Sequence, residues 1–301
     1  MLENLAAQFF FLSGFDQWAG RAIVLCLGGL VAVWTWPGRG EMTRIPYLAC
    51  LGLIALFVAA ALTVWLASLR AMVYGALWMP LAFETVAMLV AGYALAVTSA
   101  ARARDAFDAA LFGVMGFLPV INLVLVLRRS EPQADTGPRP AVPALNGGAG
   151  LAVAVVSMLG AAGLFAFTAQ RSEALEAEIA DYPAAMALRM TYTIKGLGLP
   201  VVLARFASGI ETTRRIDAST TLDAVEVMAN GIRYRYTVAD PARTASDLEA
   251  LGILKTGCAS PVLGPILDAG GRLEHVFARA DGTPLATIAV SRETCSGKKE
   301  N

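Results

Sequence analysis

The stretch GLAVAVVSMLGAAGLFAFTA, residues 150–169, divides the chain into two parts of different character. Its 20 residues include no charged side chain, and that length is what an α-helix needs to cross a bilayer. Residues 1–171 carry ten Lys and Arg and eight Asp and Glu, whereas residues 172–301 carry fourteen and sixteen. The sequence therefore predicts a membrane domain, this last span, and then a water-soluble domain.

The composition of the first part supports a bundle of membrane helices. Over the whole chain 56% of residues are apolar and 16% are charged, below the roughly 25% charged residues of typical soluble proteins. Three further stretches are apolar and long enough for spans, at about 22–36, 45–69 and 72–99. The polar, Phe-rich stretch at 2–15 is typical of a helix that lies at the membrane interface.

A fifth apolar stretch, 106–127, contains Pro119 and Asn122 and has two possible courses. If it is a re-entrant hairpin bent at Pro119, most arginines of this part fall on one side of the membrane, as cytoplasmic loops require. That side then holds Arg39, Arg44, Arg102, Arg104, Arg128, Arg129 and Arg139, against Arg21 and Arg70 on the other. We therefore expect four spans plus a re-entrant hairpin, with both termini outside, although the sequence leaves open a full crossing.

The C-terminal part has the patterns of an α+β domain. Alternating residues at 220–228 and 232–238 flank an Asn230-Gly231 turn, and a second hairpin at 272–291 turns at Asp281-Gly282. Helical stretches at 244–254 and after Ser260-Pro261 separate the two hairpins. We expect an antiparallel four-stranded sheet with helices on one face.

These patterns give the expected domain boundaries. They are a membrane helical domain at 1–129, a Pro- and Gly-rich linker at 130–148, a transmembrane helix at 149–170 and an extracytoplasmic α+β domain at 171–301.

Two cysteines of the C-terminal part, Cys258 and Cys295, favour a disulfide and an oxidising compartment. A zinc site formed by both thiols and His275, the single histidine, is the less favoured alternative. We expect His275 to be a packed or half-exposed strand residue, and the chain to hold no metal and no cofactor.

Six polar residues of the membrane part are candidates for function: Glu84, Arg102, Arg104, Asp105, Asp108 and Asn122. Glu84 lies near the middle of the third span, where a carboxylate is costly and either functional or paired to fix helix packing. The group from Arg102 to Asp108 is either functional or an ion-paired turn at the interface, and the second interpretation is favoured. No spacing brings two carboxylates onto one helix face at one depth, so we do not expect an enzyme.

In the soluble part, the strand Arg233, Tyr234, Arg235 and Tyr236 is a candidate surface for a partner. The competing and favoured interpretation is ordinary alternation, with tyrosines in the core and arginines in solvent. The part is close to neutral, so nucleic-acid binding, which needs a basic stripe, is not expected.

Two segments resemble known sequences. Residues 101–122, with Arg102-x-Arg104-Asp105 before a bent apolar stretch, resemble a segment of uncharacterised alphaproteobacterial inner-membrane proteins. Residues 212–295, with Arg214-Arg215-Ile216-Asp217, Cys258-x-x-Pro261 and Cys295 in register, resemble small disulfide-containing periplasmic domains. The resemblance implies a multi-pass protein of the bacterial inner membrane with a periplasmic C-terminal domain, and it implies no activity.

Two functions follow as hypotheses. In the first, the bilayer-embedded bundle anchors a periplasmic domain that binds an envelope protein in an accessory or structural role. In the second, the chain is a small transport or channel-like component that uses Glu84 and the hairpin at 102–122. The sequence specifies neither the partner nor the oligomeric state.

Overall fold

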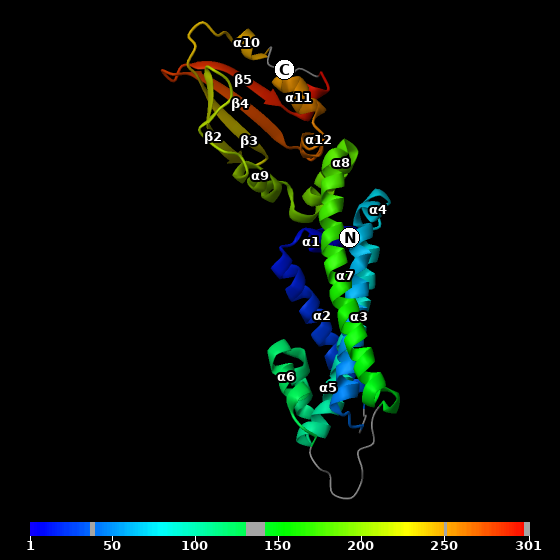
Figure 1. Ribbon diagram of the computed structural model, residues 1–301. Helices are drawn as coiled ribbons and strands as arrows, with labels where there is room; N and C mark the ends of the chain where they lie inside the picture. Colours follow the sequence, from blue (N-terminus) through cyan, green and yellow to red (C-terminus); the bar gives the residue numbers. More distant parts are fainter. Residues whose placement is uncertain (37–39, 131–141, 250–251, 298–301) are drawn as a thin grey trace, which may run out of the picture. The chain divides into compact units, whose positions relative to one another are not determined.

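The computed structural model describes residues 1–36, 40–130, 142–249 and 252–297 (Figure 1). The expected linker at 130–148 falls largely outside these ranges, as do Arg39 and Arg139. By their internal contacts the residues form two compact units, one of 12–71 and 76–176 and the other of 1–11, 72–75 and 177–301. We call them the bundle unit and the sheet unit.

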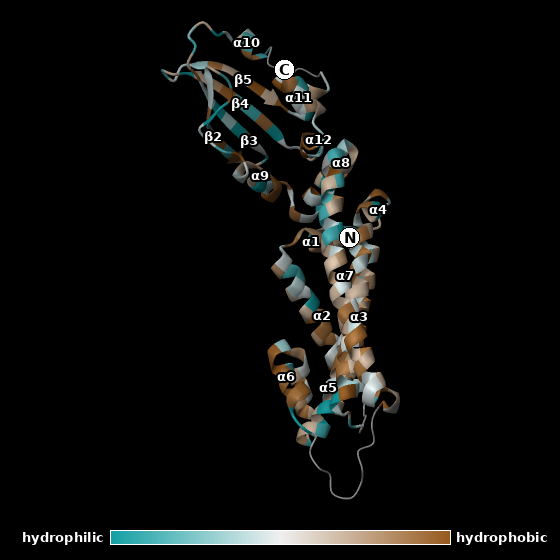
Figure 2. Ribbon diagram, viewed as in Figure 1, coloured by the Kyte–Doolittle hydropathy of each residue, from teal (hydrophilic) through white to brown (hydrophobic). Residues whose placement is uncertain are grey.

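The described part of the chain contains four helices that are long and apolar enough to cross a membrane, as the sequence predicts. They cover Gly14–Thr35, Arg44–Val73, Trp78–Phe107 and Gly147–Ile179. In Figure 2 apolar residues cover most of these helices, with polar residues toward their ends, whereas polar and apolar residues alternate on the strands. By composition the chain is a membrane protein.

The elements of the bundle unit follow in chain order. They are α2 (Gly14–Thr35), α3 (Arg44–Leu62), the 3₁₀ helix η1 (Thr63–Ala67), α4 (Ser68–Val73), α5 (Trp78–Phe107), the 3₁₀ helix η2 (Ala110–Phe117), α6 (Pro119–Leu127), the 3₁₀ turn η3 (Pro143–Leu145) and α7 (Gly147–Asp181). Helix α7 extends beyond the expected span of 149–170 at both ends, and its residues from 177 on belong to the sheet unit.

Small residues determine how closely α2 and α5 pack. A Cβ on Gly28 would collide with the carbonyl oxygen of Leu89, and one on Gly92 would collide with that of Leu25. The two helices are therefore antiparallel and cross at backbone contact, a distance that only glycine permits. This crossing sets the height at which polar side chains of α2 and α5 meet.

The stretch 106–127 folds back on itself. Helix α5 ends at Asp108, whose φ of 56° is left-handed, and η2 then packs along α5. The chain bends at Leu118, with Pro119 at the first position of α6, and α6 packs against η2. Its C-terminal end returns to the end of α5, because Arg102 donates to the carbonyl oxygens of Leu125 and Arg128. Neither η2 nor α6 has the roughly 20 residues that a membrane span needs.

The sheet unit combines a short N-terminal helix with helices and strands from the C-terminal part. Helix α1 (Leu2–Phe11) packs against α8 (Pro183–Leu197), with Ala6 and Ala7 fully buried and Gly196 against the backbone of Ala7. The remaining elements are α9 (Leu199–Ser208), β1 (Arg214–Arg215), β2 (Thr220–Met228), β3 (Gly231–Val238), α10 (Ala245–Glu249), α11 (Ile253–Ala259), α12 (Leu263–Asp268), β4 (Arg272–Arg279), β5 (Pro284–Val290) and α13 (Arg292–Cys295).

The described strands form one mixed sheet of five, in the order β1-β2-β3-β4-β5, so the expectation of four antiparallel strands is wrong. Strands β3 and β4 are parallel, with Gly231 opposite Arg272 and Val238 opposite Arg279. The reason is the connection: α10, α11 and α12 carry the chain back along the sheet, so β4 starts beside the start of β3. The extra strand β1 has only two residues, too few for alternation to reveal.

The core of the sheet unit lies between the sheet and its helices. Leu203 of α9 and Ile266 of α12 pack against Ile232 and Tyr234 of β3 and Leu273 of β4. A second cluster joins Val238 and Phe277 to Leu248 of α10. All of these strand residues point to the same face, so that face is the covered one.

Candidate functional site

Glu84 is buried near the start of α5 and has a partner for each carboxylate oxygen. Its side chain is 3% exposed and forms an ion pair with Arg21 of α2 through Oε1. Trp65 of η1 donates from Nε1 to Oε2 at 2.6 Å. The Arg21 guanidinium also lies 5.0 Å over the ring of Trp18. One carboxylate therefore joins three segments of the bundle. Its ion pair and hydrogen bond offset the cost of burying the charge.

Arg102, near the other end of α5, is fully buried and holds the end of α6. Its Nε donates to the carbonyl oxygen of Leu125 at 2.8 Å, and a terminal nitrogen donates to that of Arg128. Asp105 forms an ion pair with the same guanidinium and accepts a hydrogen bond from Ser130 Oγ at 2.6 Å. Arg102 thus satisfies carbonyls that the last turn of a helix leaves open.

The remaining polar candidates have separate surroundings. Arg104 lies 5.3 Å over the ring of Trp36, and Asp108 is exposed as the C-cap of α5. Asn122 accepts a hydrogen bond from the Tyr47 hydroxyl at 2.5 Å, and this hydroxyl also lies 3.2 Å from Ser99 Oγ. Asn122 therefore links α6 to α3.

The six candidates do not form one site. Glu84 and Arg102 are 18 positions apart on one α-helix, which separates them by about 27 Å along its axis. Within the group from 102 to 108, Arg102 and Asp105 form an ion pair at the end of α5, whereas Arg104 lies against Trp36 and Asp108 is exposed.

The candidate strand at 233–236 has two unlike faces. Tyr234 and Tyr236 lie on the covered face, where Tyr234 is buried. Arg233 and Arg235 lie on the opposite, open face, and their side chains are 36% and 54% exposed. The alternation interpretation therefore describes the strand, and only the two arginines remain available to a partner.

An ion-pair ladder crosses the open face. We use this name for Arg272, Glu274, Arg233, Glu226 and Arg235 of β2, β3 and β4. Arg233 Nε donates to Glu274 Oε2 at 2.8 Å, and Arg235 Nε lies 2.9 Å from Glu226 Oε1. Arg272 forms an ion pair with Glu274, and Arg233 lies 4.0 Å from Glu226. The ladder itself has three arginines against two carboxylates, an excess of one positive charge, and the exposed Asp223 carboxylate accepts a hydrogen bond from Thr237 on the same face.

Aromatic rings form a stack on the covered face. His275 lies 4.8 Å from the Tyr234 ring and 5.8 Å from the Tyr236 ring, and Tyr236 lies 4.6 Å from Phe277, all between nearly parallel planes. Tyr236 Oη is 3.0 Å from His275 Nδ1. Burial lowers the pKa of His275 to about 4 and raises the pKa values of both tyrosines to about 12. The rings are therefore neutral at physiological pH, and His275 is a packed strand residue.

Cys258 of α11 and Cys295 of α13 form a disulfide, as the sequence predicts, with Cα atoms 5.5 Å apart. Paired sulfurs do not ligate zinc, so the alternative site with His275 is not formed. In the described ranges no three His, Cys, Asp or Glu residues are grouped as metal ligands. The disulfide suggests an oxidising compartment.

Sequence analysis missed a polar cluster at one end of the sheet. Arg243 donates to Asp217 Oδ2 at 2.8 Å and to Thr220 Oγ1 at 2.9 Å. The hydrogen bond from Arg243 is the main reason that the pKa of Asp217 lies well below its usual range. The Asp217-x-Ser219 pattern could have predicted an Asx turn at this cluster. In the structure Ser219 N–H donates to Asp217 Oδ1, as such a turn requires.

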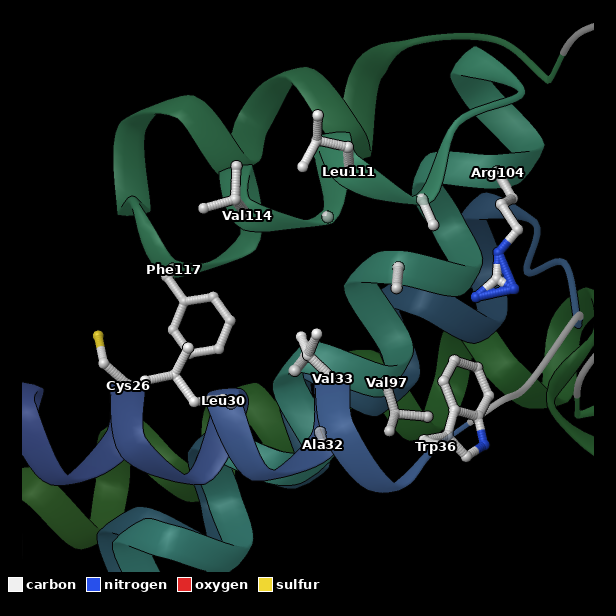
Figure 3. A pocket seen from close by; sticks show the side chains of 15 residues that line it. Cys26, Leu30, Ala32, Val33, Trp36, Val97, Arg104, Leu111, Val114 and Phe117 are labelled. Atoms are coloured by element: carbon white, nitrogen blue, oxygen red, sulfur yellow. The ribbon is translucent and has the colours of Figure 1, made fainter.

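Sequence analysis also missed a groove in the bundle unit. It has a volume of about 650 Å³ and lies among α2, α5 and η2 (Figure 3). Its lining is apolar except for the Arg104 side chain and the Cys26 thiol. The small residues Gly29, Ala32 and Gly113 could have indicated the groove from the sequence, because small side chains leave room between packed helices.

Comparison with known proteins identifies no family: neither a family model nor a curated protein matches the chain. Among solved structures, a Pseudomonas aeruginosa protein described as a "putative secreted protein" is similar at 19% identity. The match covers 33% of this chain and 94% of that one, with a TM-score of 0.30.

Proposed function

We propose that this chain is a membrane-anchored protein of the bacterial envelope whose periplasmic sheet unit binds a protein partner in an accessory role. The observation that supports it best is the open sheet face with its ion-pair ladder. The described helices that pack on the sheet contact its other face. A broad surface with exposed Arg233 and Arg235 suits a partner with a net negative patch, since complementary charge guides association.

The distribution of arginines supports a periplasmic location for this domain. Arg44 and Arg102 both donate to the carbonyl of Arg128, so three arginines gather at one end of the bundle unit. Arg104 and Arg129 belong to the same end, whereas Arg21 and Arg70 belong to the opposite one. Because cytoplasmic loops are rich in arginine, the first end is proposed to be cytoplasmic, with 106–127 as a re-entrant hairpin. A disulfide in the C-terminal domain agrees with that orientation.

Thiol labelling in intact cells tests the location. In a Cys26→Ala/Cys50→Ala background, a membrane-impermeant maleimide should label Cys258 and Cys295 only after an added reductant opens the disulfide. Labelling that requires cell lysis and no reductant would contradict the periplasmic location.

Site-specific photocrosslinking tests the partner surface. A photoreactive amino acid at Arg235 should yield a discrete adduct with an envelope protein in intact cells. The matched control is the same probe at Lys255, which is exposed on α11, a helix whose Ile253 and Cys258 pack on the core of the covered face. Charge reversal by Arg233→Glu should reduce the adduct at position 235, and Lys255→Glu should leave it unchanged. Equal adducts at both probe positions would refute the assigned surface.

The alternative, a transport or channel-like component, has weaker support. Both oxygens of Glu84 are engaged by Arg21 and Trp65, which fits a packing role. The transport hypothesis requires that Glu84→Gln abolish a flux while protein levels stay normal.

A further inference from the structure

The groove among α2, α5 and η2 has the length of one lipid chain. It follows α2 from Cys26, near the middle of that helix, to its C-cap Trp36. Ten residues of α-helix rise about 15 Å, which is half of the roughly 30 Å hydrocarbon core, or one leaflet. Figure 3 shows Cys26, Leu30 and Phe117 at one end of the groove and Trp36 and Arg104 at the other. The volume of about 650 Å³ is within the range of ligand pockets.

The walls of the groove suit hydrocarbon. Val33 is 74% exposed and Leu111 is 82% exposed, although both are large apolar residues of the bundle unit. Val33 lies on α2, a candidate membrane span, where such a surface faces lipid tails and not water, and Leu111 lines the same groove from η2. The groove is therefore accessible from the membrane.

One end of the groove is cationic. The Arg104 guanidinium lies over the indole of Trp36, at the depth where both α2 and α5 end. Tryptophan at that depth is typical of the headgroup level. Glu41 also acts electrostatically on Arg104. The described ionisable residues of this end are nevertheless five arginines (44, 102, 104, 128 and 129) against three carboxylates (41, 105 and 108), a net charge of +2.

We propose that this groove binds one anionic phospholipid, with an acyl chain along α2 from Trp36 toward Cys26 and the phosphate beside Arg104. The apolar walls contribute burial of the chain, and the arginine selects the negative headgroup. A basic pocket between transmembrane helices is a recognised arrangement for anionic lipids. Each arginine near a membrane surface favours an anionic lipid by about five-fold in affinity.

Photolabelling of the full chain in lipid nanodiscs tests the proposal. The probe is phosphatidylglycerol with a diazirine at the end of one acyl chain. Mass spectrometry should find labelled peptides concentrated around Cys26 and Phe117, at the far end of the groove from Arg104. Unlabelled phosphatidylglycerol should compete about five-fold better than phosphatidylcholine. Labelling spread evenly over the exposed apolar residues of all spans would overturn the proposal.

Three variants distinguish binding of the acyl chain in the groove from recognition of the headgroup by Arg104. Val33→Trp fills the groove and should lower labelling at least five-fold. Val31→Trp is the control, because Val31 is 52% exposed on the same helix and does not line the groove. Arg104→Gln should preserve labelling but remove the five-fold preference for phosphatidylglycerol. Unchanged labelling of Val33→Trp would overturn the site, and equal competition by both lipids in the wild type would overturn the role of Arg104. Val33→Trp leaves the ion pairs intact, so the site can be tested even if Arg104→Gln does not fold.

Discussion

Arginine–carboxylate pairs occur in both units, and their exposure differs. In the bundle unit, the side chains of Arg21 and Glu84 are 13% and 3% exposed, and those of Arg102 and Asp105 are 0% and 3% exposed. On the open sheet face, Arg235 is 54% exposed. A buried charge without its partner is very costly, so each bundle pair requires the segments that it joins to stay in contact. An exposed pair such as Arg235–Glu226 is worth little to stability, so this part of the ladder is available to serve binding, whereas Glu274 is only 8% exposed between its two arginines.

The largest expected effect comes from breaking the buried pair. Glu84→Ala leaves the Arg21 guanidinium without its carboxylate and should destabilise the bundle unit by about 3 to 5 kcal/mol. Unfolding in mixed micelles, followed by tryptophan fluorescence, measures this loss. The double variant Arg21→Met/Glu84→Met should recover most of it, because no lone charge remains. Wild-type stability for Glu84→Gln with a lost flux would instead favour the transport hypothesis.

The disulfide should dominate the stability of the sheet unit. It joins cysteines 37 positions apart, and in the chain-entropy model its removal costs about 4 kcal/mol. Hydrogen exchange of β3 and β4 in Cys258→Ser/Cys295→Ser should accelerate accordingly. Cys26→Ala is the control and should leave this exchange unchanged. Equal protection with and without the disulfide would mean that the core alone holds the sheet.

Acid should weaken the sheet unit through His275. Its pKa is about 4 when folded and about 6.5 when unfolded, so the unfolded chain binds the proton more readily. The stabilisation is complete above pH 6.5 and is lost as the pH falls toward 4, by about 2 kcal/mol at pH 5. Hydrogen exchange of β4 at pH 7.5 and pH 5, corrected for intrinsic exchange rates, measures the loss. His275→Phe should remove it; a loss that persists in this variant would refute the assignment.

The carboxyl groups of Asp217, Asp247 and Asp281 do not contribute to the loss of stability in that experiment. Hydrogen bonds lower the pKa values of all three carboxyl groups below their usual range. They therefore stay ionised between pH 5 and 7.5, and their stabilisation is lost only at lower pH.

The smallest effect on stability is expected at the open face. Arg235→Ala breaks an exposed ion pair with Glu226 and should cost less than about 1 kcal/mol. The photocrosslink from the neighbouring position 233 should nevertheless weaken in this variant, if the ladder is the partner surface. A large loss of stability would show that the ladder holds the sheet together, contrary to the comparison with the bundle.

The sequence by itself determined the features that depend on local pattern. Apolar runs such as 150–169 require a helix of span length, since a backbone in hydrocarbon must satisfy its own hydrogen bonds. Alternation around Asn230-Gly231 and the turn at Gly282, whose φ is 84°, determined the two hairpins. The cysteine pair was readable because the described C-terminal domain holds the two disulfide partners and no competing free cysteine.

Only the tertiary structure decided which distant residues meet. The partnership of Arg21 with Glu84 depends on the crossing of α2 and α5 at Gly28 and Gly92, and helix periodicity does not encode a crossing height. The parallel pairing of β3 with β4 depends on the path of three short helices, and the strand patterns are the same for either direction. The groove exists because η2 folds back along α5, a long-range packing choice that local sequence leaves open.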